Sequence, residues 1–274
     1  MRLSWQEKSV RTAVLVLGMI ATLIPIVVLI LDSFKVGSDF FSGSILPTRW
    51  TVGNYQTAFS STTGAAGDLI NSVTVAAVTT ILSITLGTLC AFSISRLRFR
   101  WVAFITYGIL AVRFYPKITT VLPYYLMMRS FGQLDTITAV VIAHVSITVP
   151  FVVLIMMAAF NELPSSLREA AQLDGCSLMH YFRLIALPLV RGSLATSAIL
   201  TAMFSWNEFI IAASITSQRA TTLPVLLSSF MTDKGTNLGA MCAVAVVVVV
   251  PIAVFILSTQ RYLARGLTLG AVKE

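Results

Sequence analysis

Long apolar runs separated by short polar segments make up most of the chain. A helix needs about 20 predominantly apolar residues to cross a bilayer, and six stretches approach or exceed that length: 12–31, 69–95, 101–118, 136–160, 192–215 and 237–260. Five of them hold at most one charged residue, whereas Arg113 and Lys117 interrupt the third. This pattern predicts an all-α polytopic membrane protein with six transmembrane helices in one domain, 1–274.

The composition agrees with a membrane protein and argues against a soluble fold. Only 11% of the residues are charged and 57% are hydrophobic, whereas a soluble domain carries about 25% charged residues. A soluble fold with so little charge would expose large apolar patches and aggregate. The chain therefore has little room for a folded soluble domain beside its spans.

The basic residues predict how the chain is oriented. Its net charge of +8 could by itself indicate a nucleic-acid partner. With six spans, however, twelve of the 19 basic residues fall on the side of the termini, in four groups of three: Arg2, Lys8 and Arg11; Arg96, Arg98 and Arg100; Arg168, Arg183 and Arg191; Arg261, Arg265 and Lys273. Because cytoplasmic loops are rich in Lys and Arg, both termini, the loop 161–191 and the tail 261–274 should be cytoplasmic. The charge then needs no nucleic acid to explain it.

The residues that usually carry catalysis or bind metal are sparse. The three cysteines and two histidines lack metal-ligand spacing, so we expect no metal site. The sequence contains no Gly-x-x-x-x-Gly-Lys-Ser/Thr phosphate loop, so the chain is not itself an ATPase. We therefore expect a non-catalytic membrane subunit without a cofactor of its own.

The loop 161–191 is too polar to span a membrane and too apolar for a flexible linker. Ser166 and Glu169 have the spacing of a capping box, and Gly175 suits the left-handed residue that ends a helix. A second short helix can start at Ser177, and Pro188 limits its extension. The pattern predicts two helices joined at a glycine, with an apolar stripe that includes Leu178, Tyr181, Phe182 and Ile185. Such a stripe could lie on the membrane surface or dock in a groove of another protein.

The same loop carries a family resemblance. The residues Glu169-Ala170-Ala171, then Gly175, then Ile185 to Pro188 resemble the EAA loop of ATP-binding-cassette (ABC) importer permeases. Three more segments are similar to the sugar-importer branch, specifically its second permease subunit typified by the maltose transporter: 71–73 through 96–99, 206–209, and 260–273. The resemblance covers nearly the whole chain from the second predicted span onward.

The resemblance implies an importer complex in a bacterial inner membrane. In that family two permeases form the path, a pair of cytoplasmic ATPases binds ATP and Mg, and an external binding protein delivers the sugar. The loop would be the coupling helix that sits in an ATPase cleft, with Glu169 facing an ATPase arginine. The implied coupling residues are Glu169, Ala170, Ala171, Asp174, Gly175, Leu178 and Pro188. The tail would insert between the ATPases through Gly270, Ala271, Val272 and Lys273.

Four residues are candidates for the transport path: Trp206, Asn207, Glu208 and Arg113. An ionisable residue inside a span usually faces a cavity or a partner, so Glu208 could line or gate the path. It could equally well form a structural hydrogen bond to a neighbouring helix, and Trp206 and Asn207 share this ambiguity.

The cations of the third stretch allow three interpretations. Around Pro116 a broken helix could line the path, but Arg113 and Lys117 are more simply explained as side chains that reach the outer interface. An anionic sugar, such as a phosphate or sulfonate derivative, is a third possibility. His144 is expected to be a packed polar residue rather than a proton relay.

A secondary, ion-coupled transporter is the alternative function. Such a protein would use membrane-embedded acids and often has repeated halves. Only Glu208 qualifies here, and the sequence shows no convincing internal repeat.

Overall fold

The computed structural model describes residues 5–60, 64–96, 101–232 and 235–268, with side chains described for fewer of them. Most of the described residues are helical, and the strands named among them form one short hairpin, β1 (Met231–Thr232) and β2 (Gly235–Thr236). The chain forms two compact units: unit 1 comprises Met1–Ala66 and Leu226–Pro251, and unit 2 comprises Gly67–Val225 and Ile252–Glu274. The all-α fold class is confirmed. The prediction of a single membrane domain stays a prediction.

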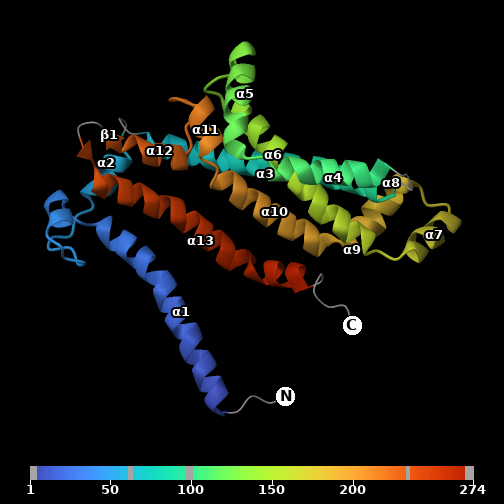
Figure 1. The fold of residues 1–274 in the computed structure, drawn as a ribbon, viewed down its shortest axis with the longest axis horizontal. Coiled ribbons are helices and arrows are strands. Elements are labelled where there is room, and N and C mark those ends of the chain that lie inside the picture. Colours follow the sequence, from blue (N-terminus) through green and yellow to red (C-terminus); the bar gives the residue numbers. More distant parts are fainter. Residues whose placement is uncertain (1–4, 61–63, 97–100, 233–234, 269–274) are drawn as a thin grey trace. The chain divides into compact units, whose positions relative to one another are not determined.

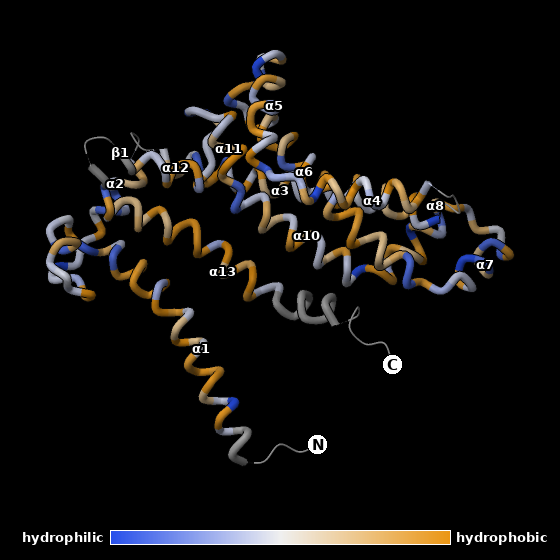
Figure 2. Tube along the Cα trace, in the orientation of Figure 1, coloured by the Kyte–Doolittle hydropathy of each residue, from blue (hydrophilic) through white to orange (hydrophobic). Residues whose placement is uncertain are grey.

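Unit 1 contains one long apolar helix and a hydrogen-bonded polar segment. The helix α1 (Trp5–Asp32) is exposed along most of its described length and is strongly hydrophobic (Figure 2). It is followed by η1 (Gly37–Phe41) and α2 (Gly53–Ala58). Asn54 ties this segment together, because its Nδ2 donates to the carbonyls of Ser33 and Lys35 at 2.9 and 2.8 Å. A Cβ at Gly239, near the start of α13 (Leu238–Thr268), would lie 2.4 Å from Asn54 Oδ1, so this close approach requires glycine.

Unit 2 is a bundle organised around α6 (Ile137–Asn161), whose Thr136 N-cap accepts a hydrogen bond from Ala139 N. The helices that pack along it include α3 (Ala65–Arg96), α4 (Trp101–Phe114) and α10 (Arg191–Trp206). The helices α3 and α6 approach closely, because a Cβ at Gly87 would lie 2.7 Å from Val152 Cβ. Small residues allow such approaches between membrane helices.

The remaining helices of unit 2 lie near the two ends of α6 (Figure 1). Towards its N-terminal end are α5 (Lys117–Ser130) and α11 (Ile210–Ile215), which pack together. Beyond its C-terminal end are α7 (Ser165–Leu173), α8 (Leu178–Tyr181), the π-helical turn η2 (Phe182–Ala186) and α9 (Leu187–Leu189). The helix α12 (Leu223–Ser229) runs from unit 2 into unit 1.

Most of the predicted spans coincide with a helix, and two of them are interrupted. Among the described residues, four helices are long and apolar enough to cross a membrane: Ser9–Asp32, Ala65–Arg96, Ile137–Asn161 and Leu238–Thr259. The segments Leu178–Leu189 and Arg191–Trp206, bent by 77°, would make a fifth span if they cross together. The predicted span 101–118 is interrupted, because α4 ends at Phe114 and Pro116 caps the separate helix α5. The predicted span 192–215 is also not one helix, because α10 and α11 are separated at Asn207–Phe209. The count of six spans stays a prediction.

Candidate functional site

The segment 161–191 folds as two short helices joined by a glycine turn. Gly175 has φ +73°, as predicted for the residue that ends α7. Its amide donates to Gln172 O, and the next amide, of Cys176, donates to Ala171 O at 2.9 Å, which together form a Schellman motif. Ser177 begins the second helix, because its Oγ accepts a hydrogen bond from His180 N.

One local prediction for this segment is wrong. The capping box of Ser166 and Glu169 does not form, because α7 already begins at Ser165 with Pro164 at the N-cap and no side-chain cap bond. Proline supplies a suitable φ but no side-chain acceptor, so the first amides of α7 are left without one. The side chain of Glu169 is exposed.

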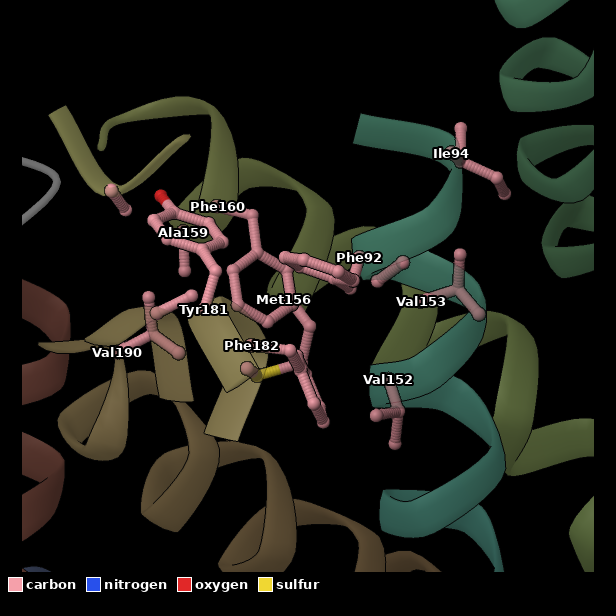
Figure 3. Packing of buried hydrophobic residues seen from close by; sticks show 13 residues of the cluster. Phe92, Ile94, Val152, Val153, Met156, Ala159, Phe160, Tyr181, Phe182 and Val190 are labelled. Carbon is pink, nitrogen blue, oxygen red and sulfur yellow. The ribbon is translucent and has the colours of Figure 1, made fainter. Parts of the chain in front are cut away.

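One face of the two helices packs into unit 2. Ala171, Tyr181 and Phe182 are buried in a cluster with Phe92 of α3 and Phe160 of α6 (Figure 3). The Phe92 ring centroid lies 4.7 Å from that of Phe182 and 5.3 Å from that of Phe160. The predicted apolar stripe is therefore divided, because Tyr181 and Phe182 face inward whereas Leu178 is exposed. Ala171, which was predicted to contact the ATPase, is also buried and faces the core of unit 2.

The opposite face of the two helices is exposed and apolar. Leu173 is 90% exposed and Leu178 is 56% exposed, although both are large hydrophobic residues. Other exposed residues of the segment 165–188 include Glu169, Ala170, Asp174, Met179, Leu184 and Pro188. We call this set, with Leu173 and Leu178, the docking face. A patch that combines apolar side chains with carboxylates is typical of a protein contact.

Arg96, at the end of α3, fixes the two helices to the bundle and was not singled out from the sequence as a site residue. Its guanidinium carbon lies 5.4 Å from the ring centroids of both Phe92 and Tyr181. Its Nη2 is 3.4 Å from the Tyr181 hydroxyl. These are cation–π contacts, so Arg96 holds α8 in place relative to α3. The pattern of basic triplets explained Arg96 by topology alone and gave no sign of this contact.

Glu208 lies in the break between α10 and α11 and is 7% exposed. Its carboxylate accepts hydrogen bonds from Ile211 N and Ala212 N at 3.1 Å, so it caps the first turn of α11. Its Oε2 is also 3.4 Å from His144 Nε2, and His144 Nδ1 is 2.9 Å from Ser205 Oγ. Glu208 thus forms structural hydrogen bonds, and its predicted role in the path stays a prediction; His144 is a packed polar residue at 1% exposed.

Arg113 stacks on two aromatic rings of the bundle. Its guanidinium carbon lies 5.0 Å from the Phe151 ring centroid and 5.7 Å from that of Phe204. It lines a cavity of about 140 Å³ together with Glu208, His144 and other residues. The structure therefore brings Arg113 and Glu208 to one cavity, as two of the four predicted path residues.

The other path candidates are placed differently. Trp206 is buried, whereas Asn207 is exposed and donates from Nδ2 to Met203 O at 2.8 Å. Neither lines the cavity that Glu208 shares with Arg113. The predicted tail contacts Gly270, Ala271, Val272 and Lys273 lie outside the described residues.

A polar anchor on the opposite side of the bundle was missed by the sequence analysis. Asp135, just before α6, has φ +58°, and its carboxylate accepts hydrogen bonds from the four backbone amides of 217–220. Asn71 and Ser72 at the start of α3 bind the same segment, through Arg219 O, Thr221 O and Leu223 N. Asp and Asn are the usual non-glycine residues at positive φ, but the sequence alone does not show which turn they bind.

Comparison with known proteins gives consistent matches. The family described as binding-protein-dependent transport system inner membrane component matches residues 83–269. The chain is 32% identical over 254 residues to the trehalose transport system permease protein SugB of Mycobacterium tuberculosis, covering 92% of each chain. It is 29% identical to the trehalose/maltose transport system permease protein MalG of Thermococcus litoralis, covering 98% of this chain and 99% of that one. Among solved structures, a chain of a bacterial ABC transporter that imports the acidic polysaccharide alginate aligns with a TM-score of 0.79 at 19% identity, covering 96% and 99% of the two chains.

Proposed function

Because this chain belongs to the family of binding-protein-dependent transport system inner membrane components, it is a permease subunit of an ABC importer, and we propose that the importer's substrate is a sugar or sugar derivative. The named sugar permeases among its relatives support this substrate class. The chain's hydrophobic helices agree with a multi-pass membrane protein. A secondary transporter is the less supported alternative.

The docking face is the single observation that carries the proposed mechanism. Leu173 and Leu178 lie on either side of the Gly175 turn in the sequence, and both are exposed. The opposite face of the two helices packs into the aromatic cluster of unit 2. A groove in a cytoplasmic ATPase would cover the two exposed leucines, and Glu169 would pair with an arginine there. Because the segment is fixed to α3 and α6, movement of the ATPase would reach the helices of unit 2.

The proposed complex has several other partners. A second permease completes the path, a pair of ATPases binds ATP and Mg, and an external binding protein delivers the sugar. This chain would then be non-catalytic, and its tail through Gly270, Ala271, Val272 and Lys273 would contact the ATPases. The complex would lie in a bacterial inner membrane. If the docking face is in the cytoplasm, both termini are cytoplasmic as well, and the 217–220 segment is on the external side.

The test is uptake by the purified complex in proteoliposomes. We expect uptake of the sugar that the binding protein carries to require enclosed ATP and to be unaffected by sodium or proton ionophores. Uptake driven by an ion gradient without ATP would instead support the secondary transporter. Cysteine labelling from outside intact cells should fail at position 177 and succeed at position 53, and labelling at position 177 would contradict the orientation.

A further inference from the structure

Two basic side chains face the same hollow region in unit 2. Arg113, in the last turn of α4, and Lys117, the first residue of α5, both line the cavity of about 140 Å³ and an adjoining one of about 420 Å³. The larger volume is in the range of ligand pockets, roughly 300–1,000 Å³. The two cavities share these cations and Ile147.

Within the described part of the chain, neither Arg113 nor Lys117 forms an ion pair with an acidic residue. The two ion pairs found there are Lys35 with Asp32 and His144 with Glu208. Glu208 lines the smaller cavity, but its carboxylate is directed to the amides of α11 and to His144. Charges within a membrane protein usually pair with each other or mark a path for substrate. Stacking on Phe151 covers part of the Arg113 guanidinium, yet supplies no anion.

A buried ring nitrogen in the smaller cavity also lacks a hydrogen bond. His144 Nε2 has no hydrogen-bond partner, and its nearest acid oxygen, Glu208 Oε2, is 3.4 Å away. Buried polar atoms are nearly always satisfied in native structures. Thr148 and Ser205 line the same cavity with hydroxyl groups. This set is suited to the hydroxyl groups of a sugar.

The start of α5 adds positive potential beside the cations. Its N-cap is Pro116, which makes no side-chain cap bond, so the first amides of this 14-residue helix have no side-chain acceptor. The N-terminus of a helix attracts anions. Lys117 at that end is unfavourable for the isolated helix, and an anion there would offset this cost.

We propose that these cavities form a subsite for an anionic sugar, with a carboxylate or sulfonate held by Arg113 and Lys117 and the sugar hydroxyls held by His144 and Ser205. This inference rests on the proposed function and names its substrate class. In the larger cavity Tyr115 and Tyr124 supply aromatic faces and hydroxyl groups for the sugar ring.

The test uses the full complex with its binding protein in proteoliposomes. The neutral probes are glucose, maltose and trehalose, and the anionic probes are glucuronate, galacturonate and glucose 6-sulfonate. We expect an anionic probe to be taken up and to stimulate ATP hydrolysis. In Arg113→Gln and Lys117→Gln, uptake of that probe at low concentration should fall at least tenfold, because a charge-assisted hydrogen bond is typically worth a factor of ten or more.

Matched controls separate this subsite from general effects of charge. Arg129→Gln removes a cation from the last turn of α5 that lines neither cavity, and should retain uptake. Its ATP hydrolysis without sugar should also be unchanged, and the probe should bind the isolated binding protein equally well in every experiment because that protein is the same throughout.

Four results would overturn the inference. Uptake of neutral probes alone would refute it and leave the proposed function standing, whereas no ATP-dependent uptake of the sugar that the binding protein carries would refute both. Normal anionic uptake in Arg113→Gln with Lys117→Gln combined would show that the cations are not used. If that double variant kept uptake but lost phosphatidylglycerol in native mass spectrometry, the site would belong to a lipid headgroup.

Discussion

Replacing Asp135 with Asn should loosen the segment 217–220 while leaving the bundle folded. The carboxylate of Asp135 accepts hydrogen bonds of 2.9–3.2 Å from all four backbone amides of that segment. Its own amide donates to Ile215 O at 2.8 Å. Asn tolerates a positive φ nearly as well as Asp, so Asp135→Asn tests the charge and the acceptors rather than the backbone conformation.

The expected cost follows from the hydrogen bonds that are lost. A hydrogen bond to a charged group contributes about 1.5–3 kcal/mol. Asn keeps one acceptor oxygen but turns an amino group towards the remaining amides, and neighbouring bonds do not add independently. We therefore expect local opening of the segment to become easier by about 2 kcal/mol, which is a factor of about 30 in the opening equilibrium.

The same carboxylate should make the segment sensitive to acid. Partial burial would raise the pKa of Asp135, but the backbone hydrogen bonds outweigh it and hold the pKa well below the usual value of 3.8. Its stabilising contribution is therefore complete above pH 3.8 and is lost as the pH falls below that value towards the lowered pKa. Asp135→Asn should abolish this acid-dependent loss.

Hydrogen exchange of 217–220, measured by mass spectrometry on the purified complex, checks the prediction. Exchange in Asp135→Asn should be about 30-fold faster there and unchanged in α6. The matched control is Glu162→Gln, which alters an exposed acid at the other end of α6. Equal protection in the parent and Asp135→Asn, or equal loss in the control, would refute the reasoning.

Three further substitutions test other parts of the account. Gly175→Val should reduce copurification of the ATPase with this chain, because a β-branched residue is strained at φ +73°. Gly175→Asn should retain this copurification, and equal ATPase recovery with the two variants would contradict the role of the turn. Glu208→Leu should impair uptake more than Glu208→Gln, because two amides of α11 lose their acceptor, and normal uptake by the Leu variant would show that Glu208 is dispensable. Gly87→Val should lower the melting temperature of the complex through about 1–3 kcal/mol of overpacking against Val152, whereas an unchanged value would mean that α3 and α6 separate without cost.

The sequence predicted the features that depend on local chemistry. A glycine between two short helical patterns indicated the turn at Gly175, and the structure has the expected positive φ there. Long uncharged runs predicted helices such as α3 and α6 close to their observed bounds. Both signals depend on residues near one another in the chain, which is why they could be interpreted directly.

The sequence did not predict features that depend on tertiary contacts. The run 192–215 is uncharged except for Glu208, and nothing local shows that this carboxylate caps a new helix at Ile210. The contact of Arg96 with Tyr181 joins residues that are 85 positions apart. Pro116 did indicate a possible break in the third stretch, and because proline favours the first positions of a helix, it could also have indicated that α5 starts there.

Cross-linking of the docking face to the ATPase tests the central claim most directly. A photoreactive group attached at Leu173→Cys, a position that is 90% exposed, should cross-link to the ATPase subunit in the purified complex. The control is Phe131→Cys, which is 68% exposed near the end of α5 and lies on the predicted external side. The account predicts an ATPase adduct at position 173 and none at position 131, and it would be contradicted by no adduct at 173 or by equal adducts at both.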